Sequence, residues 1–201
     1  MKTFEEHTDY IKQKEYEVAE KIIASMKHDY DIGQLGSFAE AAYNRVVDMF
    51  DYHDFENCQH LTMVGCGPFP MTVLHIINKY PSLKVDAIDI DPAALKVTEN
   101  LIKQLGLQDK IKLYCNNGLN HDYSLSSIVY IANLVRPKAE VLNKVWQDCK
   151  KDTLIVLRDP TESGGIYAEA GLPSAGNKFL VEGFGKNDNT FHSRHVFLRC
   201  Q

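Results

Sequence analysis

The sequence predicts an α/β fold with a mostly parallel sheet, an N-terminal helical segment and a C-terminal antiparallel hairpin. Three observations predict it. Short apolar runs typical of strands alternate with amphipathic helices between residues 60 and 157, as in βαβ units whose parallel sheet is covered on both faces. The first of these runs ends in a glycine turn. Near the C-terminus, two further strand-like runs flank a polar turn, which is a hairpin signal.

The segment before the first strand is predicted to be helical. Apolar residues recur at helical spacing from Phe4 to about Lys27. Ser37, with Glu40 three positions later, has the pattern of a capping box that opens a second helix. We therefore expect residues 1–55 to form a helical lid and residues 56–201 to form the sheet domain.

Seven strands are expected, with helices after the first, second and fourth. Asp91 is placed to cap the helix that begins at Pro92, because aspartate accepts from free N–H groups and proline is tolerated at the first helical position. Gly106 then ends this helix. The expected strands span residues 61–65, 84–89, 110–115, 127–132, 153–157, 179–184 and 193–199.

Composition excludes several classes of function. The net charge of −5 lacks the basic excess of a nucleic-acid-binding surface. No run approaches the roughly 18 apolar residues of a membrane span, and the N-terminus does not resemble a signal peptide. The five cysteines are widely spaced without a C-x-x-C pair, which argues against a disulfide framework and a zinc site. We expect a cytoplasmic protein that acts on a small molecule without a metal. Its oligomeric state stays open.

The turn after the first strand is the strongest functional signal. In the stretch L-T-M-V-G-C-G-P-F-P, Gly65 and Gly67 allow a sharp turn that brings the backbone close to a ligand. Asp89 ends the second strand 22 residues after Gly67, near the ~20 expected of a carboxylate that binds ribose hydroxyls. A tight turn without a ligand is the alternative, which Asp89 disfavours.

The turn favours S-adenosylmethionine (SAM) over a dinucleotide. A dinucleotide site has a third glycine where the helix begins, and the pyrophosphate lies on the helix N-terminus. This chain has Pro70 at that position. Because SAM carries no pyrophosphate, it does not need that arrangement, and we expect SAM as the bound molecule.

The ends of later strands supply further candidates. In SAM-binding folds an Asp or Asn after the third strand meets the adenine amino group, which makes Asn117 a candidate; an Asn-Gly turn without a ligand is equally open. Asn133 ends the fourth strand, and its amide can accept a hydrogen bond from the α-amine of SAM. Tyr167 follows the fifth strand and can face the sulfonium cation. The remaining expected cofactor-binding residues are Pro68, Ile90 and Gly118.

Three stretches resemble the nicotianamine-synthase-like enzymes, a branch of the class I SAM-dependent methyltransferase superfamily with a Rossmann-like sheet. They are V-G-C-G-P-F-P-M-T at the first turn, A-I-D-I-D-P at the second strand, and the segment from I-V-Y-I-A-N-L-V-R-P-K to L-R-D-P-T-E-S-G-G-I-Y. By this resemblance Arg158 matches the arginine of the family's last apolar strand and Tyr167 the aromatic residue of the following loop. Glu40 is the counterpart of the family's catalytic glutamate.

The resemblance implies chemistry at the γ-carbon of the methionine arm of SAM. Such enzymes transfer the 3-amino-3-carboxypropyl group and release methylthioadenosine, and relatives close the arm into azetidine-2-carboxylate. The expected catalytic residues are then Asn133 at the α-amine, Tyr167 at the sulfonium and Glu40 as proton acceptor. Two alternatives stay open. One is an N- or O-methyltransferase on a small metabolite, and the other is a SAM-binding regulator without catalysis.

Overall fold

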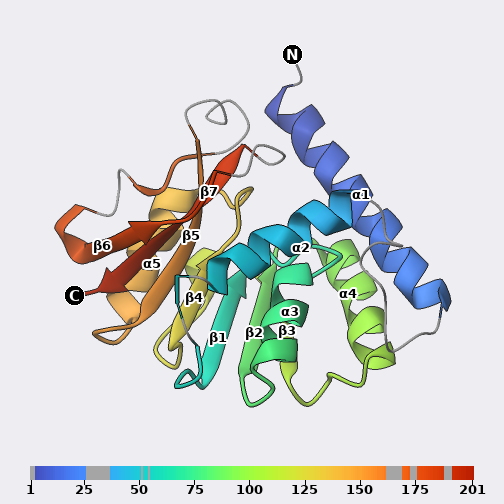
Figure 1. The fold of residues 1–201 in the computed structure, drawn as a ribbon, viewed down its shortest axis with the longest axis horizontal. Coiled ribbons are helices and arrows are strands. Elements are labelled where there is room, and N and C mark those ends of the chain that lie inside the picture. The colour runs from blue at the N-terminus through green and yellow to red at the C-terminus, as the bar shows by residue number, and fades with distance from the viewer. Residues whose placement is uncertain are drawn as a thin grey trace.

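The computed structural model describes residues 3–25, 37–50, 52–53, 55–161, 169–172, 176–187 and 192–201. The strands are β1 (His60–Val64), β2 (Lys84–Asp89), β3 (Ile111–Cys115), β4 (Ile128–Ile131), β5 (Leu154–Pro160), β6 (Phe179–Phe184) and β7 (Ser193–Cys200). They form one sheet in the order β3-β2-β1-β4-β5-β7-β6 (Figure 1). The chain runs outward from β1 to β3 and then returns to the other side of β1. This reversal makes a switch point between β1 and β4, where open α/β sheets bind ligands.

The sheet is parallel from β1 to β5, and β7 lies antiparallel between β5 and β6. Val64 pairs with Ile88 of β2 and with Ile131 of β4. The segments that follow these three strands therefore leave the sheet at the same edge. The predicted fold class, a mostly parallel sheet with a C-terminal antiparallel hairpin, is confirmed.

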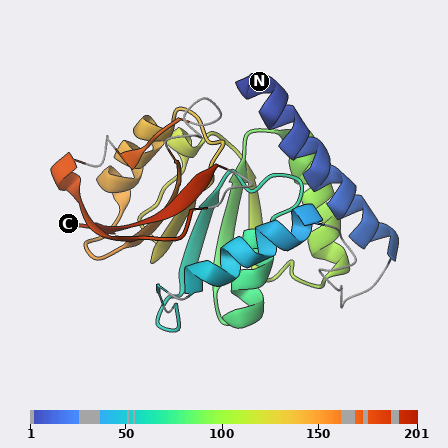
Figure 2. The same ribbon diagram turned by 45° about the horizontal axis from the view of Figure 1, so that its top comes forward.

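Five α-helices are described, with two short 3-10 helices. They are α1 (Phe4–Ser25), α2 (Ser37–Phe50), α3 (Met71–Lys79), α4 (Pro92–Gln104), α5 (Lys138–Asp148), η2 (Gly118–Asn120) and η5 (Gly176–Lys178). In both ribbon views α1 lies along α4, and α2 crosses α3 (Figures 1 and 2). Within the described part of the chain, no helix is long and apolar enough to cross a membrane.

The alternation of side chains along the strands divides the core into two clusters. Leu61 and Met63 pack with α1, α2, α3 and α4 on one face of the sheet, while Val64 packs with α5 on the other. Val18 and Ile22 of α1 are buried in the first cluster. The N-terminal helices and the sheet thus share a core, and the domain boundary after residue 55 stays a prediction.

Most predicted elements agree with the structure. β2 spans the predicted residues 84–89, and α2 begins at the predicted Ser37. Asp91 caps α4 by accepting a hydrogen bond from the backbone N–H of Ala93 at 2.8 Å, with Pro92 as the first helical residue. Gly106 follows this helix with a φ of +66°, which few residues other than glycine adopt easily.

The cysteines correct one expectation. Cys149 at the end of α5 and Cys200 at the end of β7 form a disulfide, although the wide spacing of the cysteines argues against a disulfide framework. The two residues lie 51 positions apart, so no local spacing announces the pair. Both belong to the cluster around α5, and it is this packing that brings them together.

Candidate active site

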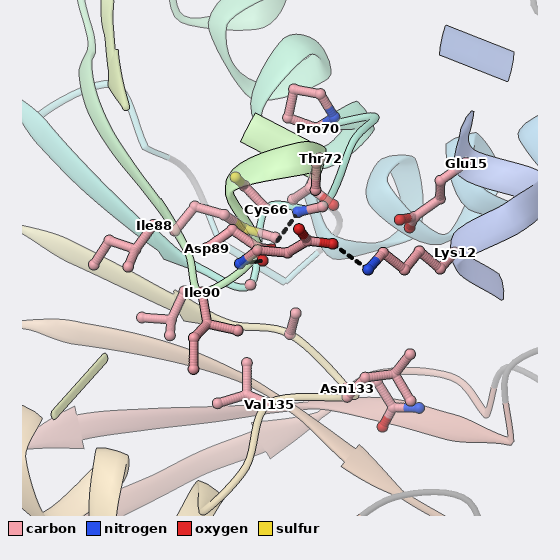
Figure 3. A pocket seen from close by; sticks show the side chains of 18 of the residues that line it. Lys12, Glu15, Cys66, Pro70, Thr72, Ile88, Asp89, Ile90, Asn133 and Val135 are labelled. Carbon is pink, nitrogen blue, oxygen red and sulfur yellow. Dashed lines mark hydrogen bonds and ion pairs between the residues drawn. The ribbon is translucent and has the colours of Figure 1, made fainter. Parts of the chain in front are cut away.

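A cavity of about 400 Å³ lies at the switch point, against the carboxyl ends of β1, β2 and β4. Its volume falls near the lower end of the range of roughly 300–1,000 Å³ for small-molecule sites. Figure 3 shows Lys12 and Glu15 reaching from α1 toward Asp89, with Ile90 and Val135 on the opposite side. The cavity therefore has one polar side on the N-terminal helix and one apolar side on the sheet loops.

The turn after β1 is shaped by two glycines. Gly65 and Gly67 have φ angles of +79° and +65°, in the left-handed region that favours glycine. A Cβ atom on Gly65 would lie 2.8 Å from Cγ2 of Val135, and one on Gly67 would lie 2.5 Å from Oε2 of Glu15. Both positions therefore require glycine, and both leave backbone exposed to the cavity.

Asp89 organises the wall of the cavity. Its carboxylate accepts hydrogen bonds from the backbone N–H of Gly67 at 2.8 Å and from that of Asp91 at 3.0 Å. Thr98 of α4 donates to the carbonyl oxygen of Gly67 at 2.7 Å. The first turn, the end of β2 and the start of α4 thus form one hydrogen-bonded unit that fixes the carboxylate in place.

Asn117 caps a turn and also lies in the wall of the cavity, while its contact with adenine stays a prediction. Its side-chain oxygen accepts a hydrogen bond from the backbone N–H of Leu119 at 3.0 Å and so caps η2. The same residue lines the cavity. A Cβ atom on the next residue, Gly118, would lie 2.9 Å from Cγ1 of Val64, so glycine lets this loop pack closely on β1.

Lys138 holds the loop after β4 in place through hydrogen bonds from its buried side chain. Its side chain is fully buried, and Nζ donates to the carbonyl oxygens of Asn133 and Arg158, each at 2.9 Å. Burial lowers the pKa of Lys138 to about 8. This one ammonium therefore joins the carboxyl ends of β4 and β5, next to two residues that line the cavity.

One side of α1 forms the polar wall of the cavity. Thr8, Ile11, Lys12 and Glu15 all line it, and their spacing of three and four residues places them on a single face of the helix. Lys12 forms an ion pair with Asp91. This hydrogen-bonded pair raises the pKa of Lys12 and lowers that of Asp91, and it connects α1 to the start of α4.

Glu15 has the most altered acid–base behaviour in this wall. Burial of its carboxyl group raises the pKa of Glu15 to about 8, and the nearby carboxylate of Asp89 acts in the same direction. The positive charges of Arg45 and Lys12 oppose the shift. Because burial outweighs the two cations, Glu15 holds a proton at neutral pH when no further cation is beside it.

The polar end of the cavity continues onto the sheet. Tyr130 of β4 and Arg158 of β5 line it, and the hydroxyl of Tyr130 lies 3.0 Å from Nε2 of His195. Burial lowers the pKa of His195 well below its ordinary value, so this ring is neutral. Arg158 is buried and donates a hydrogen bond to the hydroxyl of Ser193.

The structure brings the predicted cofactor-binding residues together. All of them line this one cavity: Gly65, Gly67, Pro68, Asp89, Ile90, Asn117, Gly118 and Asn133. Their role in binding SAM stays a prediction. Of the predicted catalytic residues, Asn133 lies in the cavity, whereas Tyr167 and the side chain of Glu40 lie outside the described residues.

Sequence reasoning missed the residues that α1 and α2 contribute, above all Lys12, Glu15 and Arg45. The signal was present, because Lys12 and Glu15 lie one and four positions after Ile11, on the face of α1 that carries buried apolar residues. Charged residues on a buried helical stripe are uncommon without a function or a partner. No pattern in the sequence indicated that this stripe faces the ligand cavity.

The family of the chain follows from a comparison with family models. The model described as "Nicotianamine synthase protein" matches residues 44–168, from α2 to beyond β5. The chain belongs to the nicotianamine synthase family. The predicted resemblance is confirmed, and with it the prediction of a SAM-dependent transferase. A search of curated proteins found no match.

Solved structures share the fold at low identity. MtNAS in complex with MTA and tNA has a TM-score of 0.76 at 18% identity, covering 97% of this chain and 73% of that one. A mutant of MtNAS in complex with S-adenosylmethionine has a TM-score of 0.73 at 16% identity, covering 97% and 75%. The dimethyltransferase RosA from Streptomyces davawensis has a TM-score of 0.62 at 12% identity, covering 84% and 59%. These likenesses show the fold.

Among the described residues, no group of three or more His, Cys, Asp or Glu side chains is arranged to hold a metal ion. Two charged residues of the cavity are paired within the protein: Lys12 forms an ion pair with Asp91, and Asp89 accepts a hydrogen bond from the backbone N–H of Gly67.

Proposed function

We propose that the chain binds SAM in this cavity and uses the aminocarboxypropyl arm as the reacting group, with methylthioadenosine as the leaving product. The arm would either close on itself to azetidine-2-carboxylate or pass to a small amine. Membership of the nicotianamine synthase family supports this chemistry. So do the names of the similar MtNAS complexes, one with S-adenosylmethionine and one with MTA.

The residues present fit SAM. The turn at Gly65 and Gly67 lines the cavity where the methionine arm would lie, and Asp89 would present a fixed carboxylate to the ribose hydroxyls. Ile90 and Val135 offer apolar surface for adenine beside Asn117. An ordinary methyltransferase would use the same residues, so they support SAM as the bound molecule and leave the reacting carbon open.

The helix after the first turn argues against a dinucleotide. Pro70 occupies the N-cap of α3. A proline has no backbone N–H, and the helix N-terminus therefore loses a donor at the place where a pyrophosphate would bind. SAM has no phosphate, so its binding does not need this backbone donor.

The observation that carries the reaction type is the wall that α1 places against the methionine-arm seat. The carboxyl group of Glu15 lies over Gly67, and Lys12 closes the adjoining edge by pairing with Asp91. The cavity has a volume of about 400 Å³, near the lower end of the range for small-molecule sites. Its size and this polar wall support attack by the arm's own amine or by a small amine.

The side chains of the cavity would supply positioning. Asn133 would hold the α-amine, and the carboxylate of Asp89 would fix the ribose. Holding a nucleophile and its target in a near-attack arrangement replaces a large part of the entropic barrier. The sulfonium is already an activated leaving group, so the main chemical demand on the protein is removal of a proton from the amine.

Incubation of the purified protein with SAM alone tests the proposal. Mass spectrometry should detect methylthioadenosine together with azetidine-2-carboxylate or, after a small amine is added, its aminocarboxypropyl adduct. S-Adenosylhomocysteine as the nucleoside product would refute the proposal in favour of methyl transfer. SAM that stays intact with and without added amines would favour a non-catalytic SAM-binding protein.

Two further features belong to the same proposal. A cytoplasmic location would give the enzyme access to SAM, and the chain has no basic surface excess that would direct it to nucleic acid. We further propose that its partners are limited to small-molecule substrates. Fractionation of cells that express the tagged protein would test the location directly.

A further inference from the structure

Tyr130 and His195 form a buried polar pair at the polar end of the cavity, and nothing in the proposed function uses it. Tyr130 lies on β4 and lines the cavity, whereas His195 lies on β7. The hydroxyl of Tyr130 is 3.0 Å from Nε2 of His195. Both side chains are almost completely buried, at 2% and 3% exposure. Polar groups kept at this depth cost stability unless they pair, and here they pair with each other across the intervening strand β5.

The ring of His195 is held in place by its surroundings. Its backbone pairs with that of Arg158 on β5, and its carbonyl oxygen accepts a hydrogen bond from the N–H of Gly185 at 2.9 Å. The ring packs against those of Tyr130 and Phe197, with centroids 5.8 and 6.0 Å away. Because the ring is packed in this way, its Nε2 gives the hydroxyl of Tyr130 a fixed partner.

The charges around this pair favour an anion. Burial lowers the pKa of His195 well below its ordinary value, and the positive charges of Arg158 and Arg45 act in the same direction. The ring is therefore neutral and carries one N–H. With the proton on Nε2, His195 donates to the oxygen of Tyr130, whose hydroxyl then keeps its own proton for a ligand. The two guanidinium groups make a negatively charged ligand atom favourable here.

The order of the strands indicates which part of SAM would reach this place. Asp89 ends β2 and Asn117 follows β3, whereas Tyr130 and Arg158 lie on β4 and β5, on the other side of β1. From β2 to β4 there are two strand spacings, about 10 Å. In the proposed function the nucleoside lies at β2 and β3, and the methionine arm crosses the glycine turn after β1. The free end of the arm, which carries the carboxylate, then lies at β4 and β5.

We propose that Tyr130 donates a hydrogen bond to the α-carboxylate of SAM and that His195 is the positioning residue that directs this hydroxyl into the cavity. The inference rests on the proposed function for the placement of the arm. A hydrogen bond to an ionised acceptor is roughly twice as strong as one between neutral groups. Fixing the carboxylate also restricts the neighbouring α-carbon and its amine, and so helps to hold the arm in a reactive geometry.

A pair of unreactive ligands tests the contact of Tyr130 apart from turnover. S-Adenosylhomocysteine and its decarboxylated analogue differ by the carboxylate, and neither has the sulfonium group that the reaction needs. In titration calorimetry, Tyr130→Phe should weaken binding of S-adenosylhomocysteine by about 10- to 100-fold, the range for a lost hydrogen bond to a charged group. Binding of the decarboxylated analogue should not change. Tyr80→Phe, which removes the hydroxyl of a buried tyrosine that does not line the cavity, is the matched control.

A double-mutant cycle tests whether His195 acts through Tyr130. His195→Leu should weaken binding of S-adenosylhomocysteine in the parent protein and have no further effect on it in Tyr130→Phe. His195→Gln should restore the affinity, because its side-chain amide can donate to the same hydroxyl. A purely structural role would instead lower the affinity for both ligands in both backgrounds. Thermal melting of each variant shows whether it is folded, and if His195→Leu is not, His195→Gln and Tyr130→Phe carry the test.

The outcomes separate this inference from the proposed function. Equal losses for the two ligands in Tyr130→Phe would overturn the carboxylate contact, and additive losses in the double mutant would overturn the role of His195. Neither result bears on which product the parent forms from SAM. Conversely, S-adenosylhomocysteine as the product made from SAM would refute the proposed function, while a loss in Tyr130→Phe confined to the carboxylate-bearing ligand would still support the contact.

Discussion

At the scale of single residues, the cavity depends on side chains whose hydrogen bonds are satisfied within the protein. Asp89 is held by the N–H groups of Gly67 and Asp91, and Asn117 by that of Leu119. Such groups are oriented before a ligand arrives, so little conformational entropy is lost on binding. Glu15 is the contrasting case, because its carboxyl group faces the cavity with no such hydrogen bond among the described residues.

Asp89→Ala should weaken SAM binding by about 1.5–3 kcal/mol, the worth of a hydrogen bond to a charged group. The loss has two sources, since the ribose loses an acceptor and the N–H of Gly67 loses its partner. Titration calorimetry measures the change, and NAD should fail to bind either protein. Asp109→Ala, at an exposed position, is the control. Unchanged affinity in Asp89→Ala would remove this residue from the site.

Asn133→Ala should lower turnover by a factor of ~100 or more, as when a preorganised polar group is lost from an active site. The Michaelis constant for SAM should change little, because the amide acts on the reacting amine. Asn78→Ala, exposed on α3, is the matched control. A raised Michaelis constant with normal turnover is the opposite result and would indicate that the amine is only a handle, as in methyl transfer.

At the scale of elements, the loops of the site are fixed by contacts between elements that are distant in sequence. Lys12 connects α1 to α4 through Asp91, and Lys138 connects the ends of β4 and β5 through two carbonyl oxygens. The second connection is the more costly, because an ammonium group is removed from water. Because Lys138 lies next to Asn133, we infer that this cost is offset by fixing the position of the loop after β4.

Lys138→Met should therefore separate stability from activity. The folded-state pKa of Lys138, about 8, lies below its ordinary value of 10.5, so between these pH values the unfolded chain binds more protons than the folded one. Stability should rise with pH across this window by at most about 3 kcal/mol. Chemical denaturation at pH 7.5 and 10 should show that this rise is smaller in Lys138→Met, which should also lose turnover. An identical pH dependence in the two proteins would contradict the argument.

At the scale of the whole molecule, the N-terminal helices and the sheet are one packed structure. Val18, Ala19 and Ile22 of α1 are almost completely buried in the same cluster as β1 and α3. The helices that shape the cavity are therefore also part of the core. A mobile lid would instead pack on a sheet domain whose core is complete without it.

Deletion of residues 1–31 should abolish turnover, because the wall that carries Lys12 and Glu15 is removed. As expected of a lid, its deletion should leave the rest of the protein folded. Because buried residues of α1 are part of the core, the truncated protein should also melt at a lower temperature, since each large apolar side chain that becomes exposed costs about 1–3 kcal/mol. Circular dichroism and the product assay measure the two effects. Full activity in the truncated protein would refute a role for α1 in closing the site.

The sequence predicted the sheet and the strand ends that line the cavity, for physical reasons. Gly65, Asp89 and Asn133 are each attached to the end of a strand, and strand ends are visible as apolar runs that stop. Lys12 and Glu15 escaped because their meaning depends on the direction in which α1 packs. That direction is set by tertiary contacts, and periodicity shows only that one face is buried.

The placement of the two walls of the cavity also has an evolutionary consequence. Everything proposed to hold the nucleoside comes from strand ends and loops after residue 60, whereas the wall beside the reacting arm comes largely from one helical face near the N-terminus. Substitutions at positions 8, 12 and 15 could change the nucleophile that such an enzyme accepts, while the residues that hold the nucleoside of SAM stay the same. Related enzymes with this architecture can therefore acquire different reactions through changes in a single helix. Libraries randomised at those three positions would be a small starting set for engineering.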